Sequence, residues 1–187
     1  MNQFAQSIRI IYMEKVEKVK MTKDIIPVGF TYSMVLVDMF PVLFFGGTAV
    51  LLGMIMENIV VITGAIISFV SGLIKVYWKY IVVKEKKNIW WMFKQMRILM
   101  PVGMLMVITG LVISSLSGKH PGVFKLMCTY PQSVFFVLGI LGMMAMIYCG
   151  MKLDSSNPKS NWIEQTINSV AQGAIFVGML LTYIGLH

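Results

Sequence analysis

The chain has 187 residues, of which 57% are hydrophobic and 13% are charged. A soluble globular domain has fewer apolar residues and about twice as many charged ones, so this composition excludes an ordinary soluble domain and favours a lipid bilayer as the surroundings. The sixteen Lys and Arg exceed the eight Asp and Glu, which gives a net charge of +8. Because these cations lie beside apolar segments, we expect anionic lipids at the cytoplasmic face as partners and no nucleic acid.

Residues 1–24 precede the first apolar run and are interrupted by charges, so we expect no cleavable signal peptide there. Apolar residues in this segment, among them Phe4, Ile8 and Ile11, recur at three- and four-residue spacing with basic residues between them. This pattern predicts an amphipathic helix that lies on the cytoplasmic leaflet. A cytosolic helix packed on the loops is the alternative.

Five apolar stretches follow, and each has the roughly 20 residues that a membrane-spanning helix needs. The expected fold is therefore all-α: a polytopic membrane protein in which residues 25–187 form a bundle of five transmembrane helices. The predicted spans are about 31–55, 59–80, 98–118, 130–151 and 165–186, and charged or turn-rich loops are expected at 84–97, 117–132 and 152–165.

The basic residues fall mainly on one side of this predicted bundle. Of the sixteen Lys and Arg, only Lys119 and Lys125 lie outside when the N-terminus is placed inside, and the other fourteen are cytoplasmic. Cytoplasmic loops retain the excess of Lys and Arg. The count therefore predicts a multi-pass protein of the plasma (inner) membrane with a cytoplasmic N-terminus and an external C-terminus.

Three of the spans carry small residues at four-residue intervals on one face. Helices in lipid gain little by hiding leucine, and they associate where small residues let backbones approach. We expect these faces to pack the helices of one bundle, and a homo-oligomer or a partner membrane subunit is the alternative occupant. The expected helix-packing residues are Gly64, Ser68, Gly72, Gly110, Ser114 and Gly178.

Asp38 lies inside the first span, about 7 Å to the cytoplasmic side of its centre. A carboxylate within a membrane costs about 2.5–3.5 kcal/mol on insertion scales, so it needs a partner. Pro41 follows three residues later and donates no hydrogen bond to the carbonyl of Val37, which leaves a backbone acceptor nearby. This arrangement is typical of a proton or cation site, and an ion pair or hydrogen bond that only packs the helices is the alternative.

The fifth span begins with a polar stripe at four-residue intervals, which must face other helices or water because buried amides are unsatisfied against lipid. Since all the intramembrane polar residues belong to the cytoplasmic half, the simplest arrangement is a polar cavity that opens inward. Structural hydrogen bonding, with Glu164 capping its helix, is the alternative. The candidate polar site comprises Asp38, Lys75, Arg97, Glu164, Asn168 and Gln172, with Lys79 in the same half.

No hydrolase or metalloprotease motif occurs, and two Cys and two His exclude a disulfide framework or a zinc cage, so we expect no catalytic residue, metal or cofactor. The leading hypothesis is a small membrane carrier, channel or membrane-embedded transport subunit, in which Asp38 converges with the polar stripe. The alternative is a non-catalytic assembly subunit that packs through its small-residue faces, with Asp38 neutralised by a single partner and no cavity. A lipid-modifying membrane enzyme is the third hypothesis, and it requires a lateral opening between spans.

Overall fold

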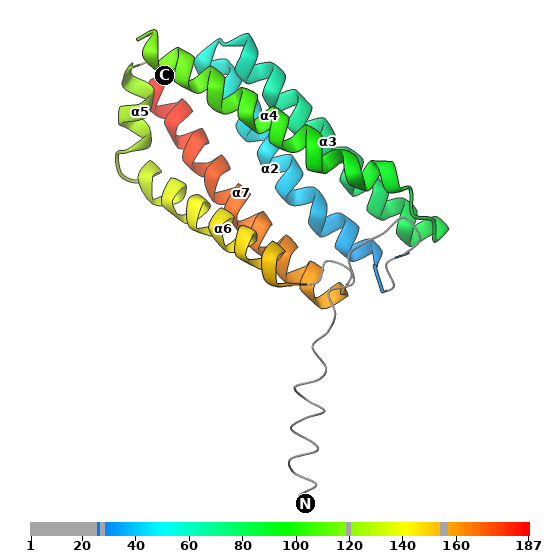
Figure 1. Ribbon diagram of the computed structural model, residues 1–187. Helices are drawn as coiled ribbons and strands as arrows, with labels where there is room; N and C mark the ends of the chain where they lie inside the picture. Colours follow the sequence, from blue (N-terminus) through cyan, green and yellow to red (C-terminus); the bar gives the residue numbers. More distant parts are fainter. Residues whose placement is uncertain (1–25, 27–28, 119–120, 154–156) are drawn as a thin grey trace, which may run out of the picture.

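The computed structural model describes residues 26, 29–118, 121–153 and 157–187 (Figure 1). The amphipathic helix expected in residues 1–24 lies outside these residues. The described part is helical without strands, and five of its helices are long and apolar enough to cross a membrane. This confirms the all-α expectation and indicates a multi-pass integral membrane protein.

The helices extend beyond the apolar stretches that predicted them. α4 begins eight residues before its expected span (90 against 98) and α7 begins seven residues before its span (158 against 165). The expected loop at 84–97 is wrong in most of its length, because only residues 86–89 separate two helices; Lys, Glu, Gln and Arg are good helix formers and continue a helix beyond the apolar run. The bounds are α2 Tyr32–Met56, α3 Ile59–Glu85, α4 Trp90–Leu116, α5 Pro121–Met127, α6 Gln132–Lys152 and α7 Pro158–Leu186.

The two-residue turn between α2 and α3 is fixed by one asparagine. Glu57 ends α2 in the left-handed region with φ 45°, and its backbone N–H donates to the carbonyl of Gly53. Asn58 then caps α3, because its side-chain oxygen accepts from the N–H of Val60 at 2.9 Å. Its amide nitrogen donates to the Ser114 hydroxyl at 2.8 Å and to the carbonyl of Gly110 at 3.1 Å, so the turn is also attached to α4.

The long helices pack as an open row in the order α4, α3, α2, α7, α6 (Figure 1). α3 and α4 form one antiparallel hairpin and α6 and α7 form another, while the short α5 contacts both α6 and α7. α2 lies in the centre, with α3 on one side and α7 on the other. Along the helix axes, α2 begins at the end of the bundle where the α3–α4 and α6–α7 turns lie, and α7 finishes at the opposite end (Figure 1).

The α3–α4 hairpin is built on contact between two backbones. A Cβ atom added at Gly64 would lie 2.5 Å from the carbonyl oxygen of Gly103, and one added at Gly103 would lie 2.6 Å from the carbonyl oxygen of Gly64. Ser68 is fully buried and its hydroxyl donates to the carbonyl of Met100 at 3.5 Å. One face of α3 therefore approaches α4 as closely as helices allow.

The other small residues are divided among several interfaces. Positions four apart on an α-helix drift by about 40° per step, so Gly72 has turned away from α4 and faces Val42 of α2. Gly178 of α7 faces two aromatic side chains of α6, Phe135 and Phe136. The α6–α7 contact also uses Gly142, where an added Cβ would lie 2.6 Å from the Cβ of Ala171.

Two adjacent glycines narrow the middle of α2. A Cβ at Gly46 would lie 2.6 Å from the ring of Phe69 in α3, and a Cβ at Gly47 would lie 2.6 Å from the ring of Phe176 in α7. α2 is a continuous helix through both positions. The pair therefore marks a close crossing, in which each neighbouring helix contributes an aromatic ring.

We expect Gly64→Ala to lower the free energy of unfolding by about 1–3 kcal/mol, because the new methyl group overpacks the α3–α4 contact. Gly150→Ala in α6 is the matched control, since a Cβ there meets nothing within 4 Å. Thermal unfolding of the detergent-solubilised variants measures the difference. Equal midpoints for the two variants would show that α3 and α4 do not cross at Gly64.

Two cysteines near opposite ends of α6 allow a test of the orientation of the protein in the membrane. Cys128 is exposed just after α5, and Cys149 is partly buried near the end of α6 that adjoins the α6–α7 turn. With a cytoplasmic N-terminus, a membrane-impermeant thiol reagent applied to intact cells modifies Cys128 and spares Cys149. Modification of Cys149 alone would show that the protein has the opposite orientation in the membrane.

Candidate functional site

A buried ion pair joins α2 to α3. Lys79 Nζ lies 2.9 Å from Asp38 Oδ2, and both side chains are 2% exposed. Lys75, one turn earlier in α3, lies 3.8 Å from Asp38 Oδ1 and is 22% exposed. Charges so deeply buried are tolerated only when they are paired, so the Asp38 carboxylate depends chiefly on the Lys79 ammonium group, and Lys75 adds a weaker attraction.

α7 completes the cluster from the other side of α2. Lys79 Nζ donates to Asn161 Oδ1 at 3.0 Å, and Asn161 is itself buried. The carboxylate of Glu164 adds an attractive electrostatic interaction with the same ammonium group. Asp38 and Glu164 balance the charges of Lys75 and Lys79, so the charge cluster formed by these five residues is neutral and joins α2, α3 and α7.

The antiparallel arrangement of α2 and α3 explains why these residues meet. Asp38 is six residues after the first residue of α2 (38 against 32), and Lys79 is six residues before the last residue of α3 (79 against 85). The two positions therefore lie at the same level of the hairpin. α2 stays helical through Pro41, so the carboxylate projects from a continuous helix and not from a broken one.

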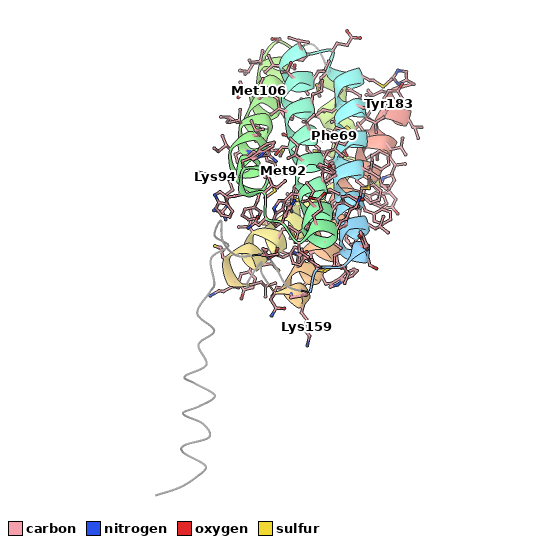
Figure 2. The ribbon with its side chains drawn as sticks, turned by 90° about the vertical axis from the view of Figure 1, so that its right-hand side faces the viewer. Phe69, Met92, Lys94, Met106, Lys159 and Tyr183 are labelled. Atoms are coloured by element: carbon pink, nitrogen blue, oxygen red, sulfur yellow. The ribbon has the colours of Figure 1, made fainter. Side chains whose placement is uncertain are left out.

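The charge cluster lies near one end of the membrane-spanning part. α2 has 25 residues and is about 37 Å long, so Asp38 is about 9 Å from its start. The hydrocarbon core is about 30 Å thick, which places the cluster close to its edge. Half-way along the helices, the crossing of Gly46 and Gly47 is filled by apolar rings, and Phe69 lies between the levels of Lys159 and Tyr183 (Figure 2).

The structure brings together three of the six residues of the expected polar site and places the other three elsewhere. Asp38, Lys75 and Glu164 lie in the charge cluster. Gln172 is turned by the same helical drift toward α6, where its amide nitrogen lies 3.4 Å from the sulfur of Met143. Arg97 is exposed on α4, with its guanidinium 5.2 Å from the ring centre of Phe93. Asn168 is half-buried one turn beyond Glu164.

Two residues of the cluster were not among the expected site residues. Lys79 was interpreted only as a cation of the cytoplasmic half, although it lies four residues after Lys75 and therefore on the same face of the helix. Asn161 lies before the apolar stretch that defined the fifth span, and it enters the site because α7 begins at Pro158. An acidic residue in one span and an i, i+4 lysine pair in the next was the available signal.

A second feature is an apolar groove between α2 and α3, with a volume of about 580 Å³. Gly46, Gly47 and Gly53 line it on α2, and Ile66 and Phe69 line it on α3. Its lining residues carry no charged or hydrogen-bonding side chain, so it suits hydrocarbon or the apolar side chains of another helix. Within the described ranges, three or more His, Cys, Asp or Glu side chains do not group closely enough to hold a metal ion.

Comparison with protein-family models, curated proteins and solved structures finds no match. The class of the protein therefore rests on the fold and the site alone. They define a multi-pass integral membrane protein in which a neutral charge cluster joins three of the five long helices.

Asp38→Asn is expected to destabilise the protein by about 3–5 kcal/mol, because it leaves the buried Lys79 ammonium without its counter-charge. Combining it with Lys79→Met removes the second charge, and the double variant is expected to recover most of the lost stability. Thermal unfolding in detergent checks both. Lys75→Met is the control and loses at most about 1 kcal/mol, since this longer and more exposed pair is weak. A stable Asp38→Asn single variant would contradict the structural role.

Proposed function

We propose that the chain is a non-catalytic integral membrane subunit whose row of helices packs against another membrane component. The observation that carries this proposal is the neutral charge cluster. In this proposal Asp38 is a structural group, because its buried carboxylate is held by Lys79 at 2.9 Å and by Lys75 at 3.8 Å. The assembly-subunit hypothesis expected a single partner for Asp38, whereas two lysines lie within 3.8 Å of its carboxylate.

The depth of the cluster also favours a subunit over a carrier. Substrate sites of secondary transporters lie near the bilayer midplane, typically where helices are interrupted. Asp38 lies about 9 Å from the start of the 25-residue α2, and this helix is continuous. At mid-depth, Phe69 and Phe176 pack against the two glycines of α2, so apolar groups occupy the level at which a carrier holds its substrate.

The open row supplies the surface for a partner. The lipid-exposed side of α2 and α3 includes the groove over Gly46, Gly47 and Gly53. Small residues leave room for the side chains of another helix, and this is how membrane helices associate without a hydrophobic driving force. A second copy of the chain and a different membrane subunit are both partners of this kind.

The location proposed for this subunit is the plasma (inner) membrane. The excess of Lys and Arg supports a cytoplasmic position for the beginning of α2, the α3–α4 turn and the α6–α7 turn. The C-terminus is then external, and the charge cluster lies at the cytoplasmic edge of the hydrocarbon.

One observation keeps an inward-facing carrier as the second candidate. Gln165 lies one turn after Asn161 in α7, is 2% exposed, and its side-chain oxygen has no hydrogen-bond partner among the described residues. A buried acceptor of this kind continues the polar face of α7 from the charge cluster toward mid-depth, and a water or cation would satisfy it.

Two experiments test the proposed function: one measures ion flux through the protein, and the other measures its contact with a partner protein. Proteoliposomes loaded with a pH-sensitive dye and held at a membrane potential are expected to show no more proton or cation flux than empty liposomes. Flux that is present in the parent and lost in the stable Asp38→Asn, Lys79→Met double variant would support the carrier instead.

Contact is measured with a photoreactive residue in native membranes. At Val50, which is 62% exposed and lines the groove, cross-linking is expected to give a discrete protein adduct. Leu138 on α6 is the matched control, since it is 52% exposed outside the groove and should react with lipid alone. An adduct of twice 21.1 kDa identifies a second copy of the chain. Lipid adducts alone at both positions would contradict the subunit proposal.

A further inference from the structure

The turn between α3 and α4 lies against packed aromatic side chains. Trp78 of α3 is 1% exposed, its ring centre is 5.0 Å from that of Phe93 in α4, and its indole N–H donates to the side-chain oxygen of Asn88 at 3.1 Å. Trp90 packs on the same Phe93 ring with centres 5.4 Å apart. The connecting turn is therefore attached to a buried aromatic core through Asn88.

This turn displays a concentration of positive charge. Residues 84–97 contain five basic side chains and one acid, a net charge of +4 (5 minus 1). Lys84, Lys86, Lys87 and Lys94 are exposed. Glu85 lies 3.8 Å from Lys87, but both groups are largely exposed, so this pair neutralises little of the field.

An exposed indole accompanies the lysines. Trp91, in the first turn of α4, is 62% exposed, while the adjacent Met92 is buried in the core. Tryptophan is enriched at the level of lipid head groups, because its ring is apolar and its N–H is polar. α3 has 27 residues and is about 40 Å long, so its end extends beyond a hydrocarbon core of about 30 Å to that level.

We propose that the α3–α4 turn, through Lys86, Lys87 and Trp91, is a binding site for the head groups of anionic phospholipids. The ammonium groups donate to phosphate oxygens, and Trp91 anchors the turn at the interface. The α6–α7 turn on the same side is a weaker competitor, since residues 152–159 hold two lysines and one aspartate, a net charge of +1 (2 minus 1). This site is independent of the partner surface proposed for α2 and α3.

Native mass spectrometry of the full-length protein in detergent tests the proposal, with phosphatidylglycerol as the anionic probe and phosphatidylcholine as the zwitterionic one. The parent is expected to bind phosphatidylglycerol more tightly. Lys86→Gln with Lys87→Gln should lower that affinity by about fivefold per lysine and weaken phosphatidylcholine binding much less, because the choline group offsets the charge of the phosphate. Trp91→Ala should weaken the binding of both lipids, because the anchor does not distinguish their charge.

The matched control is Lys152→Gln with Lys159→Gln, which removes the same charge from exposed positions at the ends of α6 and α7 and is expected to lower phosphatidylglycerol affinity by less than the α3–α4 double variant does. Unchanged helix content and thermal midpoint establish that both double variants are folded. The proposal is overturned if the parent does not prefer the anionic lipid, or if the two double variants lose affinity equally. It is also overturned if the lysines of the α3–α4 turn bind an acidic cytoplasmic protein and no lipid.

Discussion

The pairing of Asp38 with Lys79 constrains the rest of the structure. Neither charge is stable alone in the hydrocarbon, so α2 and α3 must pack at the register that brings them together. A shift of α3 by one residue would turn Lys79 by about 100° and separate the charges. Because Lys79 also binds Asn161, the same side chain determines the depth of α7. The Lys79 side chain thus determines the relative positions of three helices, and the apolar contacts form around it.

The packing of α2 follows from this central position. A helix with neighbours on two sides needs both contacts to be close, and Gly46 and Gly47 provide this by admitting Phe69 on one side and Phe176 on the other. Glycine costs helix stability in water, but in the membrane the backbone keeps its own hydrogen bonds and gains dispersion contacts from the rings. The α3–α4 pair uses glycine differently, bringing the backbones of Gly64 and Gly103 together without an intervening ring.

Length and composition were sufficient to predict five long helices, because crossing a bilayer requires a fixed number of apolar residues. They did not predict where the helices end: Lys94, Gln95 and Arg97 are good helix formers and lie within α4, which begins at Trp90. α7 begins at Pro158 because Asn157 caps it and proline suits the first helical position. The sequence also indicated that Asp38 needs a partner. It could not distinguish Lys79 from Arg97 in that role, because the choice depends on which helices are neighbours. α2 packs on α3, whereas α4 lies on the far side of α3.

The row of helices also has a consequence for biogenesis. The hairpin of α3 and α4 and the hairpin of α6 and α7 are connected chiefly through α2, so the chain divides into an early unit, α2 to α4, and a late unit, α5 to α7. Domains generally assemble in the order of synthesis. The early unit already contains Asp38 with both lysines, so the carboxylate has its counter-charges before α7 is made. Docking of the late unit then adds Asn161 and Glu164 to Lys79, which completes the charge cluster.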